Sequence, residues 1–115
     1  MMNSNVNTRI EMLKKYLLED PQDSFIRYAL ALELLNINEL TESERLFQTL
    51  LKNDPDYLAS YYHYGKLLES MQNFETAAEI YKSGIQIAKN QNNQQTLKEL
   101  KAALESISSE DDEME

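Results

Sequence analysis

The single histidine, His63, is the side chain best suited to acid–base chemistry near neutral pH. An imidazole titrates close to neutrality, so His63 could act as a general base or as a pH switch. An active site would also need a nucleophile, an orienting group or a second metal ligand, and none stands at a suitable spacing from His63. We therefore expect His63 to be a packing or groove residue. We predict a chain that is not an enzyme and has no catalytic residue, cofactor or metal.

The chain contains no cysteine. This excludes disulfides, thiolate zinc sites and thiol nucleophiles, and it fits a reducing compartment. The two glycines, Gly65 and Gly84, fall inside helical patterns, so no glycine-rich loop is available to bind phosphate. The first residues lack the basic and apolar segments of a secretory signal, and no apolar run approaches the roughly 18 residues of a membrane span. We expect a cytoplasmic protein with no membrane segment.

Acidic residues dominate the charge of the chain, whose net charge is −9. Such a chain repels nucleic acid and anionic membrane surfaces, and no stripe of Lys or Arg offsets the repulsion. Residues 108–115 carry much of the charge and do not match a calcium-loop pattern. We predict that this tail is disordered and solvated, with binding of a cation or a basic partner as the alternative. Its acidic residues are Glu110, Asp111, Asp112, Glu113 and Glu115.

An internal repeat organises the rest of the sequence. Asp20-Pro21 and Asp54-Pro55 lie 34 residues apart, and the helical pattern between them recurs after the second pair. A fixed period of this length is typical of stacked helix-turn-helix arrays. The apolar spacing predicts an all-α chain with one domain over residues 1–107. Its parts are a half-repeat helix over 6–20, repeats over 22–54 and 56–90, and a capping helix over 94–107.

Large and small residues alternate in a set pattern along the two helices of the second repeat: Tyr61, Tyr64, Gly65 and Leu68 on the first, and Phe74, Ala77, Tyr81 and Gly84 on the second. In this pattern the repeat resembles the tetratricopeptide repeat (TPR) family, in particular its small bacterial members. The first repeat matches less closely, because Arg27 stands where a large aromatic residue is usual and Ser43 replaces alanine. The resemblance implies a right-handed helix-turn-helix superhelix in which small residues let paired helices approach closely.

The resemblance also implies a function, because the first helices of such repeats line a concave groove that binds a peptide or helix of a partner. Phe25, Tyr28 and Leu32 follow helical spacing on the first repeat. Shifting them by the period gives Ala59, Tyr62 and Lys66, with His63 beside them, and the last helix could add Lys98 or Lys101. Four tyrosines at the start of the second repeat spread around their helix, so they do not form one aromatic box. They are Tyr57, Tyr61, Tyr62 and Tyr64. The family pattern assigns Tyr61 and Tyr64 to the core and Tyr62 to the groove.

The chemistry of this groove predicts a protein or peptide partner with apolar anchors and some negative charge. One family mode, in which lysines clamp a terminal carboxylate, is disfavoured because the matching positions hold Tyr28, Leu32 and His63. Two alternatives stay open. The chain could be a structural homodimer that associates through the same apolar surface, or its own N-terminal segment could cover the residues around Phe25.

Overall fold

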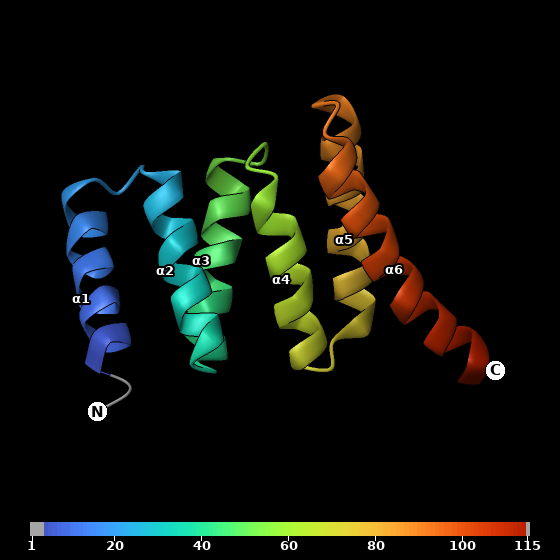
Figure 1. The fold of residues 1–115 in the computed structure, drawn as a ribbon, viewed down its shortest axis with the longest axis horizontal. Coiled ribbons are helices and arrows are strands. Elements are labelled where there is room, and N and C mark those ends of the chain that lie inside the picture. Colours follow the sequence, from blue (N-terminus) through green and yellow to red (C-terminus); the bar gives the residue numbers. More distant parts are fainter. Residues whose placement is uncertain (1–3, 115) are drawn as a thin grey trace. The chain divides into compact units, whose positions relative to one another are not determined.

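The computed structural model describes the backbone of residues 4–114 and the side chains of residues 5–108. These residues form helices joined by short turns and contain no strand, which confirms the predicted all-α class (Figure 1). The chain consists of two compact units, and the boundary between them lies between Pro55 and Asp56. Unit 1 contains α1 (Ser4–Glu19), α2 (Ser24–Asn36) and α3 (Leu40–Asn53), and unit 2 contains α4 (Ala59–Ser70), α5 (Phe74–Asn90) and α6 (Gln94–Met114).

Three turns share one backbone geometry: those between α2 and α3, α4 and α5, and α5 and α6. Each contains a residue other than glycine with positive φ, namely Asn38 at 65°, Gln72 at 61° and Asn92 at 55°. In each turn the next residue donates its backbone N–H to a carbonyl five residues earlier, which closes the preceding helix. These bonds are Glu39 to Leu34 (2.8 Å), Asn73 to Leu68 (2.8 Å) and Asn93 to Ala88 (2.9 Å).

Side-chain caps begin three of the helices. Asp23 accepts the Ile26 N–H at 3.0 Å, Asn73 accepts the Thr76 N–H at 3.4 Å, and Asn93 accepts the Thr96 N–H at 3.0 Å. Each bond satisfies one backbone donor that has no partner within its helix.

The core of unit 2 depends on close helix approach at its two glycines. A Cβ at Gly65 would lie 2.1 Å from Cε1 of Tyr81, and one at Gly84 would lie 2.7 Å from Cβ of Tyr61. Tyr81 and Leu100 are fully buried, so α4, α5 and α6 share one core. The predicted role of the small residue at position 65 is thereby confirmed.

The core of unit 1 is centred on the pairing of α2 and α3. Ala31, Phe47 and Leu50 are fully buried. Ser43 is buried with them, and its hydroxyl donates to the Ala31 carbonyl oxygen at 2.8 Å, so this buried hydroxyl is paired. On the outer side, α1 packs against α2.

Two helix ends lie away from the bounds expected from the sequence. The first helix of the repeat expected over 56–90 begins at Ala59, because Tyr57 and Leu58 form a tighter turn whose carbonyls accept from Ser60 and Tyr61. The backbone of α6 stays helical to Met114, beyond the expected end at 107. No Gly or Pro interrupts residues 108–114, so nothing in the local sequence breaks the helix. The side chains of the acidic residues there lie outside the described ones.

Candidate partner-binding surfaces

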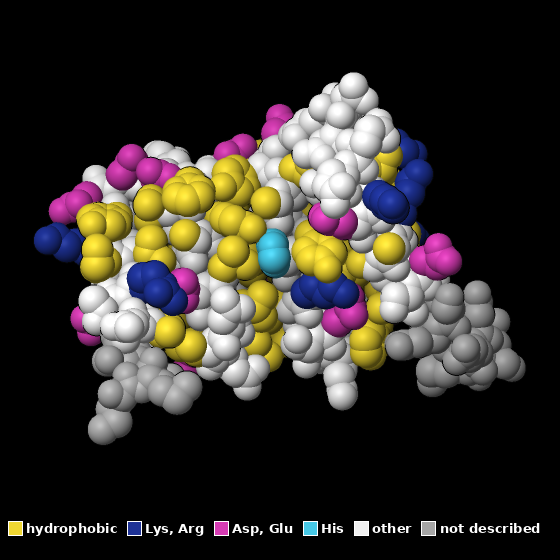
Figure 2. Space-filling model, viewed as in Figure 1, with side chains coloured by type: hydrophobic (Ala, Val, Ile, Leu, Met, Phe, Trp, Pro, Cys, Tyr) yellow, Lys and Arg dark blue, Asp and Glu magenta, His cyan; other side chains and the backbone are white. Residues whose placement is uncertain are grey.

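In unit 1, the predicted groove residues Phe25, Tyr28 and Leu32 lie on α2. The side chain of Phe25 is 62% exposed, whereas Tyr28 and Leu32 are half-buried. The packing of α1 on α2 leaves Phe25 exposed, so α1 does not cover that side chain. Figure 2 shows hydrophobic side chains gathered on the visible face of this unit.

A charged clamp joins α1 to α2 in the same unit. The Arg9 guanidinium donates to both carboxylate oxygens of Glu33, from Nε at 2.8 Å and from Nη2 at 3.3 Å. A two-point contact of this kind fixes orientation as well as distance. It ties the half-repeat helix to the first helix of repeat 1.

In unit 2, Tyr62 and Lys66 form one wall of a groove between α4 and α6. The opposite wall is built from short or acidic side chains of α6, and the groove has a volume of about 290 Å³. The short side chains leave space beside the Tyr62 ring. The residues that line the groove are Tyr62, Lys66, Glu99, Ala102, Ala103 and Ser106.

The α6 wall of this groove differs from the expected one. Sequence reasoning placed Lys98 or Lys101 there, and this is wrong, because Glu99 supplies the charged side chain. Lys98 and Lys101 line a separate hollow along α6 itself. The helical spacing allowed either face of α6 to pack on α4, and Leu100 and Ala103 decide the rotation by being buried.

Lys66 is held in place by two neighbours. Its Nζ lies 5.5 Å from the centroid of the Tyr62 ring, within the range of a cation–π contact, and 3.7 Å from a carboxylate oxygen of Glu69. Glu69 also accepts a hydrogen bond from the Tyr81 hydroxyl of α5. Burial and this bond both raise the pKa of Tyr81, so the phenol stays protonated and acts as a donor.

His63 stands next to Tyr62 on α4, and their rings meet edge to face with centroids 5.3 Å apart. The side chain is half-buried, as expected for a packing or groove residue. Burial lowers the pKa of His63, and the charge of Glu99 on α6 partly opposes that effect. In Figure 2 the histidine, coloured cyan, shares a face with hydrophobic and basic side chains of unit 2.

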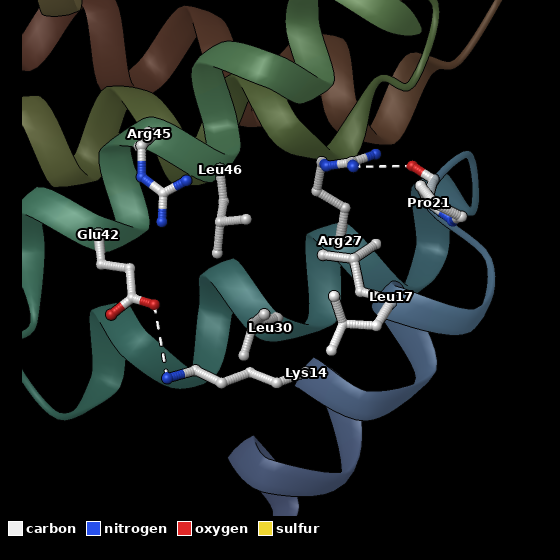
Figure 3. A pocket seen from close by; sticks show the side chains of 9 residues that line it. Lys14, Leu17, Pro21, Arg27, Leu30, Glu42, Arg45 and Leu46 are labelled. Atoms are coloured by element: carbon white, nitrogen blue, oxygen red, sulfur yellow. Dashed lines mark hydrogen bonds and ion pairs between the residues drawn. The ribbon is translucent and has the colours of Figure 1, made fainter.

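Unit 1 contains a cleft that sequence reasoning missed. It lies between α1 and α3 over α2, has a volume of about 450 Å³, and combines a leucine floor with a basic rim (Figure 3). Leu17-Leu18 near the end of α1 was a signal for it, because two adjacent leucines cannot both face α2. The lining residues are Lys14, Leu17, Leu18, Pro21, Arg27, Leu30, Glu42, Arg45 and Leu46.

Among the side chains of residues 5–108, no group of three or more His, Asp or Glu comes together in a way that could hold a metal ion. None of the helices over residues 4–114 has both the length and the apolar character needed to cross a membrane. The helices pair through equivalent turns, and small residues lie at the pair contacts. These features define a helical-repeat protein.

A comparison of the sequence with models of known families found no match, and neither did a comparison with curated proteins. Solved structures do match. A tetratricopeptide repeat domain protein from Salinibacter ruber is 39% identical, with a TM-score of 0.74 over 78% of this chain and 91% of that one. The chain belongs to the tetratricopeptide repeat family.

More distant structures share the fold at low sequence identity. The TPR2B domain of yeast Sti1, solved as a complex with pHsp70, is 14% identical, with a TM-score of 0.86 over 95% of this chain and 87% of that one. PcrH, solved with the chaperone-binding region of PopD, is 11% identical, with a TM-score of 0.87 over 96% of this chain and 84% of that one.

Proposed function

We propose that this chain is a non-enzymatic protein-interaction module whose α2 and α4 faces bind a peptide or helix of a partner protein. The observation that carries the proposal is the groove of unit 2, where Tyr62 and Lys66 stand opposite short side chains of α6. Grooves of this composition suit peptide recognition, because an aromatic wall supplies contact area and a fixed charge supplies orientation.

The α2 face of unit 1 supports the same function. Phe25 is a large apolar side chain that is 62% exposed on a helix with two buried leucines, Leu30 and Leu34. Burying such a side chain is worth roughly 1.5–3 kcal/mol. A partner segment that contacts Phe25, Tyr28 and Leu32 would gain affinity from that burial.

The relatives supply independent support. The Sti1 domain and PcrH, which share the fold, were both solved in complex with part of another protein. We infer that this chain uses its repeats in the same general way. Their low identity carries no residue-level detail, so the assignment of binding residues rests on the exposure and groove geometry of this chain.

The chemistry of the unit 2 groove narrows the partner. Lys66 is shared between the Tyr62 ring and Glu69, and Glu99 faces it from α6. A partner segment with an apolar anchor for the Tyr62 ring and a carboxylate for Lys66 fits this arrangement. A strongly acidic segment does not, because Glu99 would repel it.

A structural homodimer is the second candidate, favoured by the exposure of Phe25. Light-scattering mass over a concentration series, measured for the wild type and for Phe25→Ala and Tyr28→Ala, separates the two functions. A mass that these two substitutions leave unchanged supports the module, whereas a dimer that dissociates on Phe25→Ala or Tyr28→Ala supports self-association through this surface.

Affinity capture with paired variants tests the binding residues. We expect Tyr28→Ala and Tyr62→Ala to lose the partner while the helical circular dichroism spectrum stays unchanged. Tyr16→Ala is the matched control, because Tyr16 is an exposed tyrosine on α1 outside both faces. If the Tyr28 and Tyr62 variants recover the same proteins as the control, the assignment of these faces is wrong.

A further inference from the structure

The α1/α3 cleft of unit 1 concentrates positive charge on an acidic chain. Unit 1 has six Lys and Arg residues, and three of them line this cleft beside a single acidic residue. The chain as a whole carries −9. A basic rim is therefore a local feature of this cleft and does not follow from the composition. The three cations are Lys14, Arg27 and Arg45.

The three cations differ in how far they are already engaged. Arg27 is buried and donates to the Pro21 carbonyl oxygen at 2.7 Å, and Lys14 pairs with Glu42 at 3.5 Å. Among the described residues, Arg45 has no hydrogen-bond or ion-pair partner, and it is exposed on α3. Figure 3 shows its guanidinium at the edge of the cleft. Arg45 is thus available to pair with a carboxylate from outside.

The floor of the cleft is apolar. Leu17, Leu30 and Leu46 line it from three different helices. Leu18 at its edge is 83% exposed, which is the largest exposure among the large apolar side chains of the described residues. Exposed leucines beside a basic rim match a segment that has one apolar anchor between carboxylates.

The chain carries a segment of that chemistry. Residues 110–115 read Glu-Asp-Asp-Glu-Met-Glu, so Met114 is flanked by acidic residues on both sides. Methionine is unbranched and fills irregular apolar gaps well. We propose that the α1/α3 cleft binds residues 110–115 of a second copy of the chain, with Met114 on the leucine floor and the carboxylates on the basic rim. This self-association uses a surface other than the proposed partner-binding faces.

Complementation between two variants tests the proposal. Arg45→Glu alters the cleft and keeps the tail. A second variant replaces Glu110, Asp111, Asp112, Glu113 and Glu115 with Gln or Asn, so it keeps the cleft and loses the tail charge. In sedimentation equilibrium the wild-type chain should associate, with a dissociation constant that rises with salt because of charge screening. Each variant alone should weaken association by at least about tenfold.

The mixture of the two variants gives the decisive result. The acidic tail of Arg45→Glu can dock in the intact cleft of the tail variant, so association should return only when the two are mixed. Lys15→Glu is the matched charge control, because Lys15 is exposed on α1 outside the cleft, and it should associate like the wild type. Unchanged circular dichroism spectra establish that the variants fold.

A labelled peptide of residues 106–115, acetylated and amidated at its ends, reports on the contact directly. It should bind the tail variant, and Met114→Ser in the peptide should weaken binding. A wild-type chain that stays monomeric at every concentration and salt overturns the proposal. So does an Arg45→Glu variant that associates as strongly as Lys15→Glu.

Discussion

Repeat 1 and repeat 2 fill equivalent positions with different chemistry. At the α4/α5 contact of repeat 2, the Tyr81 hydroxyl donates a hydrogen bond to the Glu69 carboxylate. The positions 34 residues earlier, at the α2/α3 contact of repeat 1, hold Phe47 and Leu35. The polar pair of one repeat is replaced by an apolar pair in the other, and both rings are fully buried. Both repeats have a large aromatic ring at this position, and the neighbouring residue matches it: a carboxylate beside the tyrosine hydroxyl, and a leucine beside the phenylalanine. The comparison indicates that the position needs an aromatic ring but can hold either tyrosine or phenylalanine.

The small residues at the helix contacts follow the same rule. Gly65 has no side chain, which allows the Tyr81 ring to lie against α4. At the equivalent position of repeat 1, the methyl group of Ala31 occupies that space. Ser43, the equivalent of Ala77, donates its hydroxyl to the Ala31 carbonyl. Repeat 1 therefore uses a hydrogen bond where repeat 2 uses close approach.

The largest effect is expected at Gly65. Gly65→Ala places a Cβ about 2.1 Å from Cε1 of a ring that is held by Glu69, so the ring or the helix must move. We expect a loss of about 3 kcal/mol in the free energy of unfolding, measured by urea denaturation.

The reverse substitution at the equivalent position of repeat 1 gives the comparison for the free energy of unfolding. Ala31→Gly should cost about 1 kcal/mol, because it only weakens the helix and removes one methyl group. Equal losses for the two variants would contradict the claim that the repeats differ in how closely their helices approach.

Tyr81→Phe should cost about 2 kcal/mol, because it leaves the Glu69 carboxylate without its buried hydroxyl donor. Adding Glu69→Leu copies the Phe47 and Leu35 pair of repeat 1 and should recover part of the loss. A double-mutant cycle by thermal or urea unfolding measures the coupling. Strict additivity would show that the two residues do not act as a pair.

Ser43→Ala should cost about 1 kcal/mol, the net value of a hydrogen bond between uncharged groups. The Ala31 carbonyl keeps its place in the helix, so no large rearrangement is expected. Thr49→Ala on the same helix is the control for a lost hydroxyl. A stabilised Ser43→Ala variant would mean that repeat 1 gains nothing from this bond.

Gln72→Gly should stabilise the chain by about 0.5–1 kcal/mol, since φ is 61° at this position and glycine adopts positive φ without steric cost. Asn38→Gly in the equivalent turn should gain less, because asparagine tolerates that conformation better than glutamine. Unfolding midpoints compare the two. A larger gain at position 38 would reverse the expected order.

The smallest effect concerns pH. Because burial lowers the pKa of His63, the unfolded chain takes up this proton at higher pH than the folded chain. The contribution of His63 to stability is complete above its unfolded pKa of about 6.5 and is lost as the pH falls from there through the lower folded pKa. His63→Gln should flatten this part of the stability profile. Unchanged curvature in that variant would exclude His63 as its source.

The repeat architecture could be predicted from the sequence because its signals are local and periodic. Proline after aspartate ends a helix, Asn in a turn tolerates positive φ, and small residues at paired positions allow close helix contact. The repeats expected from the sequence end at residue 90 and leave out the third turn, although Asn92 and Asn93 hold the places of Gln72 and Asn73 in the second turn.

The sites were less predictable because they depend on helix rotation and on contacts distant in sequence. The period predicted Tyr62 and Lys66 as groove residues, and both line the hollow between α4 and α6. Figure 2 shows the face on which His63 lies. The period could not show that α6 turns Glu99 toward that groove. The α1/α3 cleft arises from three helices at once, and no single stretch of sequence encodes it.

Site-specific photo-cross-linking tests the proposed interaction module most directly. A benzophenone amino acid would replace Tyr62, Tyr28 or, as the control, the exposed Gln86 of α5. The account predicts a covalent adduct with a different polypeptide from positions 62 and 28 and none from position 86. No adduct at 62 and 28, or an equal yield at 86, would contradict the claim that these faces bind a partner. Adducts at 62 and 28 with a second copy of the chain would support the homodimer instead.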